Sequence, residues 1–269
     1  MPGVRGVPGK SGVRGVPGKS AGDWAASASP VAHVFAGALG ESIELGGPEA
    51  HHLARVLRLH AGEVVTAADG RGRWRPYEVS AVFGAAVRLE ARGPAGTEPA
   101  LEPSLAVAFC LTKGDKPDFT VQKLTELGVD RMLPVISARS VSRPAGSRGE
   151  AVVARWRRVA LEAARQCRRS RLPDIAEIST LASLSGHPGL VVADPGGHAP
   201  SQLGRPPGGE LLLVIGPEGG LAPEELEVLR PWARVGLGPL VLRAETAALA
   251  AAAALSIPRS VGKDEHSRS

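Results

Sequence analysis

Two glycine-rich stretches decide the fold of this chain: LLLVIGPEGGLAPEEL (Leu211–Leu226) and VGLGPLVLRAETAALAAAAAL (Val235–Leu255). Each is a short apolar run, followed by a tight turn of Gly and Pro and then by a helix start. The run at 211–215 has no polar alternation, which is typical of a strand buried on both faces. Because glycine reaches backbone angles that other residues avoid, such turns bring bare N–H and C=O groups close to a ligand. The pair indicates a small-molecule pocket made of main chain, although either turn alone equally fits an ordinary strand-to-helix connection.

Strand and helix patterns alternate around these stretches from 104 to 258, which predicts an α/β domain with a parallel sheet. We expect strands at 105–111, 132–136, 190–193 and 211–215, and helices at 117–127 and 151–170. Pro134 indicates that the strand at 132–136 lies at an edge of the sheet. The strand at 190–193 runs into Asp194-Pro195-Gly196-Gly197, which is a third candidate bend.

The segment 31–98 has a different pattern, with short strands between Gly-rich turns, and it predicts a small β-barrel. Strands are expected at 32–35, 42–45, 63–68, 74–79 and 85–89, a helix at 48–60, and a hairpin turn at 69–72. A Pro-rich linker at 93–103 follows. We expect a flexible basic extension at 1–30, where GVRGVPGKS occurs twice, and a disordered tail at 259–269. The GKS triplets are no phosphate-binding loop, because valine stands where that loop needs its first glycine.

Composition excludes several classes of protein. No run of 18 apolar residues occurs without a charge, so we expect no membrane span. Cys110 and Cys167 are far apart and give neither a disulfide framework nor a metal spacing. His51 and His52 are neighbours on the predicted helix and point apart, so we expect no metal site. The absence of a secretory pattern near the first residue favours a cytoplasmic location.

Positive charge is concentrated in one part of the chain. The net charge is +5, but 137–171 alone contains ten arginines against Glu150 and Glu162. These arginines are at positions 139, 143, 148, 155, 157, 158, 165, 168, 169 and 171. Such a concentration is typical of a protein that binds a polyanion, although a solvated helix face remains an alternative.

Several motifs occur in a fixed order: HLARVLR (52–58), QKLTELG (122–128), GPEGG (216–220), LGP (237–239) and LRAETA (242–247). Together they resemble the ribosomal RNA small subunit methyltransferase E family, in the SPOUT superfamily of trefoil-knotted methyltransferases. The resemblance covers about 33–257. It implies a PUA-like β-barrel at 31–98 that helps to hold RNA, and a knotted domain at 104–258 that binds S-adenosylmethionine and forms a homodimer. The implied reaction is methylation of N3 of one uridine in small-subunit ribosomal RNA.

The resemblance also implies the residues of the cofactor site, which form three walls of backbone. They are Asp194, Pro195, Ile215, Gly216, Pro217, Glu218, Gly219, Gly220, Leu237, Gly238, Leu242, Thr246 and Ala247. Uridine N3 carries a proton, so its methylation needs a base or a group that stabilises the anion. Arg243 is the candidate stabiliser, and Glu245 and Glu218 are candidate bases. Each of the three has a structural alternative, namely a loop ion pair or a favourable charge at a helix N-terminus.

The candidate RNA contacts are basic residues from both units. They are Arg55, Arg58, Lys113, Lys123, Arg139, Arg165 and Arg169. Two other functions stay open at this point: an RNA-binding ribosome assembly factor that performs no chemistry, and a ribose 2′-O-methyltransferase of a related knotted branch.

Overall fold

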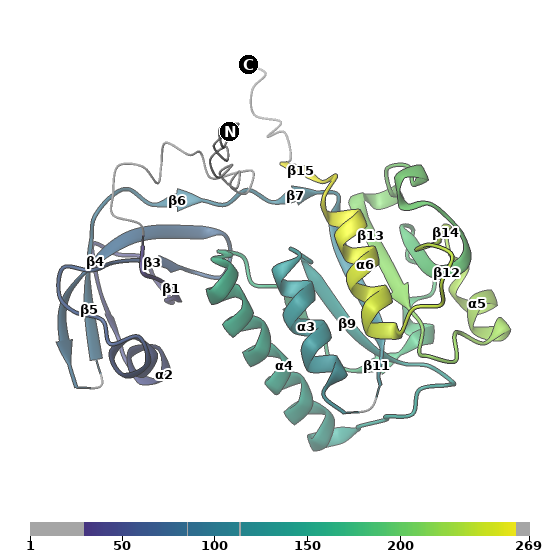
Figure 1. Cartoon of the computed structure of the whole chain (residues 1–269), viewed down its shortest axis with the longest axis horizontal. Helices are drawn as coiled ribbons and strands as arrows, with labels where there is room; N and C mark the ends of the chain where they lie inside the picture. Colours follow the sequence, from purple (N-terminus) through teal and green to yellow (C-terminus); the bar gives the residue numbers. More distant parts are fainter. Residues whose placement is uncertain (1–29, 85, 113, 262–269) are drawn as a thin grey trace, which may run out of the picture.

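The computed structural model describes residues 30–84, 86–112 and 114–261. The extension expected at 1–30 lies outside this part of the chain except for Pro30. Figure 1 shows two units side by side, joined by an extended segment that carries β6 (Gly96–Thr97) and β7 (Leu101–Glu102). The helix α4 (Gly146–Cys167) of the second unit faces the first unit.

The first unit is a sheet with the strand order β1-β3-β4-β5-β2, and β6 adds to β4. Its strands are β1 (Ala32–Phe35), β2 (Ser42–Leu45), β3 (Val64–Ala68), β4 (Arg73–Phe83) and β5 (Ala86–Ala91). The predicted hairpin at 69–72 is confirmed: β3 pairs antiparallel with β4, and the Asp69 carboxylate accepts the N–H groups of Arg71 and Arg73. Leu53, Tyr77 and Leu89 are fully buried in its core.

The helix of the first unit is shorter than the sequence predicts. It comprises α2 (Gly47–His51) and a π-helical turn, η1 (His52–Val56), so the helix expected at 48–60 ends four residues early. Arg58 has a left-handed φ of 54°. Residues other than glycine rarely adopt this backbone conformation, and it does not occur inside a right-handed helix. The motif at 52–58 therefore runs over the end of a helix.

The second unit contains the predicted parallel sheet. Its strands are β8 (Ser104–Cys110), β9 (Arg131–Ile136), β10 (Asp174–Ile175), β11 (Ser179–Thr180), β12 (Leu190–His198), β13 (Glu210–Ile215) and β14 (Ala233–Val235). The order is β10-β9-β8-β13-β12-β14, with β11 also on β9, and all these pairs are parallel. β9 is therefore no edge strand, contrary to expectation. Pro134 is tolerated because β10 pairs with Arg131 and Met132, and β11 pairs only from Val135 onward.

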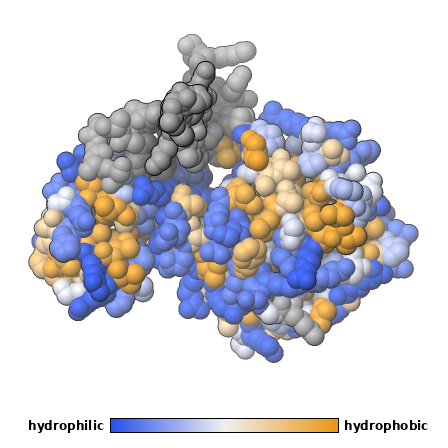
Figure 2. Space-filling model, in the orientation of Figure 1, coloured by the Kyte–Doolittle hydropathy of each residue, from blue (hydrophilic) through white to orange (hydrophobic). Residues whose placement is uncertain are grey.

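Helices cover both faces of this sheet, which is why its strands are continuously apolar. The helices α3 (Lys116–Glu126), α4 and α6 (Ala244–Ser256) pack against the face that includes Leu213. The opposite face, which includes Leu212, contacts η2 (Leu181–Leu184) and α5 (Pro223–Leu229). Figure 2 shows the molecule from the side of α3, α4 and α6, where hydrophilic residues surround separate hydrophobic patches. No helix among the described residues is long and apolar enough to cross a lipid bilayer.

The end of the described chain is part of the fold. Ser260 and Val261 form β15, which pairs antiparallel with β7. The buried guanidinium of Arg259 donates to the Asp130 carboxylate and to the Gly128 carbonyl. The disordered tail expected at 259–269 is therefore wrong for 259–261, and its remaining residues lie outside the described part of the chain.

Candidate functional site

Three bends meet at one edge of the second sheet. The first, Asp194–Gly197, is an irregularity within β12, so the strand expected at 190–193 continues through it to His198. The second and third follow β13 and β14, and the three strands are parallel neighbours in the order β13-β12-β14. The carboxyl ends of neighbouring parallel strands lie at the same edge, and ligands of open α/β sheets bind outside that edge. The expectation that these three bends lie close together is therefore consistent with the topology.

The first and third bends touch through their backbones. The Gly236 N–H donates to the His198 carbonyl over 2.7 Å. A Cβ on Gly197 would lie 2.5 Å from the Val235 carbonyl carbon, and one on Gly236 would lie 2.6 Å from the Gly197 oxygen. Both distances are closer than real Cβ contacts, so glycine is required at both crossing points. Neither glycine belongs to the predicted site, although the Gly196-Gly197 pair was a signal that such a close approach exists.

The second bend is a tight turn between β13 and α5. The Gly220 N–H donates to the Pro217 carbonyl over 2.8 Å, and Gly220 has a φ of 70°. Ala222 offers no side-chain cap for α5, but the Glu225 carboxylate accepts the Ala222 N–H over 2.8 Å. Its other oxygen accepts the Ala138 N–H over 2.7 Å and so ties this turn to the loop after β9.

Lys116 links the two candidate bases, Glu218 and Glu245, by ion pairs. Its ammonium lies 2.7 Å from Glu218 Oε1 on the second bend and 3.5 Å from Glu245 Oε2 at the start of α6. The hydrogen bond from Lys116 lowers the pKa of the Glu218 carboxyl, and the same bond raises the pKa of Lys116. Lys116 is not among the site residues predicted from the sequence. Its place just after β8, at the same sheet edge as the three bends, was the available signal.

Glu245 and Arg243 are placed differently from Glu218. Glu245 Oε2 is buried, and its contact with the described residues is the 3.5 Å ion pair with Lys116, without a hydrogen bond. Arg243 is exposed at the N-cap of α6, and its positive charge contributes to lowering the pKa of Glu218, after the larger effect of Lys116. The structure thus brings Glu218 and Glu245 together around Lys116, and Arg243 lies close enough to influence Glu218.

The other predicted cofactor residues are spread along the three bends. Ile215 and Pro217 are buried, Leu237 and Ala247 pack against the core, and Leu242 is half-buried. Thr246, Pro195 and Gly219 are exposed. The Asp194 carboxylate accepts the Gly196 N–H and an N–H of Arg234. A Cβ on Gly238, whose φ is 115°, would meet no atom within 4 Å, so open space adjoins the third bend.

The predicted RNA contacts separate into two groups. Arg55, Arg58 and Arg139 are exposed, and Arg139 donates to the Gly219 carbonyl of the second bend. Lys123 is partly exposed and pairs with Glu126 at 2.8 Å. Lys113 lies outside the described residues.

Arg165 and Arg169 lie in contacts between structural elements and do not present their charges to solvent. The side chain of Arg165 is 7% exposed, and it pairs with Glu49 of the first unit and with Glu162. The side chain of Arg169 is 9% exposed, and it donates to the Thr125 carbonyl and pairs with Asp130. Burial lowers the pKa of both guanidinium groups. The expectation that these two arginines contact RNA is therefore corrected, because their donors face protein acceptors.

Comparison with known proteins bears on this site. The model of a family described as an RNA methyltransferase domain matches 100–256, and that of an RNA methyltransferase PUA domain matches 45–84. Ribosomal RNA small subunit methyltransferase E of Mycobacterium bovis is 32% identical over 222 residues, which are 78% of this chain and 84% of that protein. The Bacillus subtilis protein of the same name is 31% identical over 229 residues, 80% of this chain and 90% of that protein.

A solved structure shows the same architecture. The methyltransferase E of Neisseria gonorrhoeae, bound to S-adenosyl methionine, aligns with a TM-score of 0.76 at 27% identity and covers 85% of this chain and 98% of that one. The matched ranges include all three bends, the motif at 122–128 and most of the first unit. The chain therefore belongs to the ribosomal RNA small subunit methyltransferase E family of RNA methyltransferases.

Proposed function

We propose that this protein transfers a methyl group from S-adenosylmethionine to N3 of a uridine in small-subunit ribosomal RNA. The family supports an RNA methyltransferase, and the Neisseria relative supports the cofactor. The observation that carries the proposal is the meeting of three backbone bends with Glu245 and Arg243 at one sheet edge.

The bends offer both backbone hydrogen-bonding groups and room for the cofactor. S-adenosylmethionine supplies a methyl group activated by a sulfonium. Open space adjoins Gly238, and backbone groups of the bends can hold an adenine edge and an amino-acid end. Glu245 Oε2 faces the Lys116 ammonium at 3.5 Å and accepts no closer hydrogen bond from the described residues, so it can also accept one from a bound molecule.

Among the candidate bases, we propose Glu245 as the group that accepts the N3 proton. Glu218 is less basic than an ordinary carboxylate because Lys116 lowers its pKa, so it suits a positioning role. Arg243 is exposed and lies close enough to influence the Glu218 carboxylate, so its role in the proposal is to stabilise negative charge on a uracil oxygen. The acceptor base must be unpaired, because N3 lies inside a base pair in duplex RNA.

Further features of the family are proposals for this chain. A trefoil knot is supported by the return of the chain from β14 at the sheet edge to α6, which packs over β8 and β13. The PUA match supports a barrel in the first unit. A homodimer is supported by Leu240 and Val241, which are 75% and 87% exposed on the third bend. The cytoplasmic location stays a prediction.

The test is nucleoside mass spectrometry after incubation with labelled S-adenosylmethionine and either isolated small subunits or naked RNA. We expect 3-methyluridine, a 10²–10⁴-fold loss of rate for Glu245→Gln, of roughly the size that general bases supply, and a smaller loss for Glu218→Gln. A methyl on ribose would support the related branch. No cofactor binding by calorimetry would support a silent assembly factor.

A further inference from the structure

A hollow of about 510 Å³ lies at the same sheet edge as the three bends. It opens at the carboxyl ends of β8 and β9, between the start of α3 and the first turns of α4. β8 is the neighbour of β13 in the sheet, so the hollow and the bends share one edge. Pro117 lines the hollow, and the preceding residue, Lys116, contacts Glu218 and Glu245.

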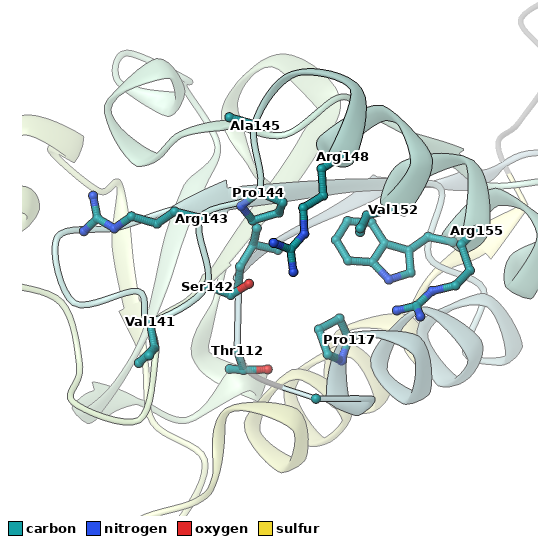
Figure 3. Close-up of a pocket in the computed structure, with 13 residues that line it drawn as sticks. Thr112, Pro117, Val141, Ser142, Arg143, Pro144, Ala145, Arg148, Val152 and Arg155 are labelled. Atoms are coloured by element: carbon teal, nitrogen blue, oxygen red, sulfur yellow. The ribbon is translucent and has the colours of Figure 1, made fainter.

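Two arginines direct their charges into this hollow. Figure 3 shows the guanidinium groups of Arg148 and Arg155 pointing toward its centre, whereas that of Arg143 points away. Arg143 donates to the carbonyls of Ser137, Ala138 and Ser140, so it shapes the loop. Arg148 is exposed and makes no hydrogen bond or ion pair to the described protein groups. Its donors are available to a ligand.

Arg155 is held in position by Asp118 of α3. It pairs with Asp118 at 2.8 Å while its side chain stays 50% exposed. The same carboxylate oxygen accepts the indole N–H of the buried Trp156 over 2.9 Å. One anion shared by two donors leaves Arg155 with unused N–H groups that face the hollow.

The rest of the lining combines apolar and neutral polar groups. Pro117 and Val152 give an apolar wall, and Thr112 and Ser142 place hydroxyl groups at the side facing Arg148 and Arg155 (Figure 3). Two cations, two hydroxyls and an apolar wall match the parts of a nucleotide, namely a phosphate, a sugar and a base.

We propose that this hollow binds one nucleotide of the RNA substrate, with its phosphate at Arg148 and Arg155. This assignment rests on the proposed function. It gives the path of the RNA strand: the target base lies at the cofactor bends, and a nucleotide of the same strand lies in the hollow. It also replaces Arg165 and Arg169 as the phosphate ligands within the arginine-rich part of the sequence.

The test compares Arg148→Ala with Arg158→Ala. Arg158 is an exposed arginine of the same helix that lines a different groove, between α3 and α4, so both variants lose one positive charge. Affinity for a single-stranded ribosomal RNA fragment is measured from 50 to 200 mM salt, together with S-adenosylmethionine affinity. For Arg148→Ala we expect about a tenfold loss of RNA affinity, the size of one charge-assisted hydrogen bond, a salt slope lower by about 1, and unchanged cofactor affinity. Arg148→Lys should recover part of the loss.

Other outcomes overturn the proposal. Equal losses in the two variants would mean a general charge effect without a pocket. An unchanged RNA affinity in Arg148→Ala, with methylation intact, would remove the hollow from the RNA path while leaving the proposed function standing. If uridine monophosphate binds the wild-type protein, Arg148→Ala abolishes that binding and RNA affinity is unaffected, the hollow is a site for free nucleotides. If the wild-type protein binds no S-adenosylmethionine, the proposed function fails first.

Discussion

Replacement of Arg165 by Met tests whether this arginine joins the two units or contacts RNA. The pair with Glu49 links the C-terminal part of α4 to α2 of the first unit, and the side chains are 7% and 20% exposed. Removal of one partner of a buried ion pair costs about 3–5 kcal/mol, because the other charge is left uncompensated. Here Glu49 keeps some access to water, and Glu49 Oε2 and Arg165 Nε already lack partners. We therefore expect a loss of about 2 kcal/mol, below that range.

The assay is urea unfolding of four proteins: wild type, Arg165→Met, Glu49→Met and the double variant. The double variant leaves no buried charge behind, so it should regain most of the loss and give a coupling free energy of roughly 2 kcal/mol, within the range for contacting residues. Arg158→Met, an exposed change on the same helix, should stay within about 0.5 kcal/mol of wild type.

RNA affinity decides between the two roles of Arg165. Measured well below the unfolding transition, Arg165→Met should bind RNA with the wild-type salt slope, because its charge is already neutralised by protein carboxylates. The reasoning is refuted if Arg165→Met is as stable as wild type but its salt slope falls by about 1, which is the signature of a lost phosphate contact.

Three further predictions concern the core and the bends. Leu213→Ala, at a fully buried position of β13, should lower the free energy of unfolding by about 3 kcal/mol, within the usual range for a leucine cavity, as measured by urea unfolding. Gly197→Ala should weaken S-adenosylmethionine binding in calorimetry, because its Cβ would displace the Val235 backbone. An unchanged affinity would show that the contact between Gly197 and Gly236 does not shape the cofactor site. Lys116→Gln should raise the pKa of Glu218 toward the ordinary carboxyl value in a carboxyl NMR titration. In the wild type, the Lys116–Glu218 pair stabilises the fold at neutral pH, and this contribution is lost as acid protonates Glu218 through its lowered pKa.

The sequence predicted the second unit well because its signals are local. Apolar runs such as 211–215 have the length of buried strands, and Gly-Pro turns mark where they end. Parallel strands place those ends at one edge, so the neighbourhood of the three bends followed once the sheet was assumed. The crossing of Gly197 and Gly236 did not follow, since the Gly196-Gly197 pair indicates a close backbone approach but does not show that its partner lies nearly 40 residues further along the chain.

Helix and strand ends were less predictable where a distant partner fixes them. Arg259 is the first residue of the predicted disordered tail, yet its guanidinium is buried against Asp130 and Gly128. The strand pair β7–β15 similarly unites the predicted linker with the predicted tail. In both cases the stabilising partner lies more than 100 residues away, so composition alone indicated disorder.

The arginine-rich part of the sequence shows why charge density does not assign a role to a single residue. All its arginines carry the same charge, but distant acids meet two of them: Glu49 from α2 for Arg165, and Asp130 from the turn before β9 for Arg169. Arg165, in the C-terminal part of α4, therefore contacts the first unit, whereas Arg169, just after this helix, contacts a turn of the second unit. Near the N-terminal part, Arg148 makes no ion pair with the residues that the structure describes, which is why the proposed phosphate contact is assigned to it. If the proposed RNA contact holds, α4 contacts the first unit through Arg165 near one end and an RNA phosphate through Arg148 near the other, and the rigid length of the helix sets the distance between them.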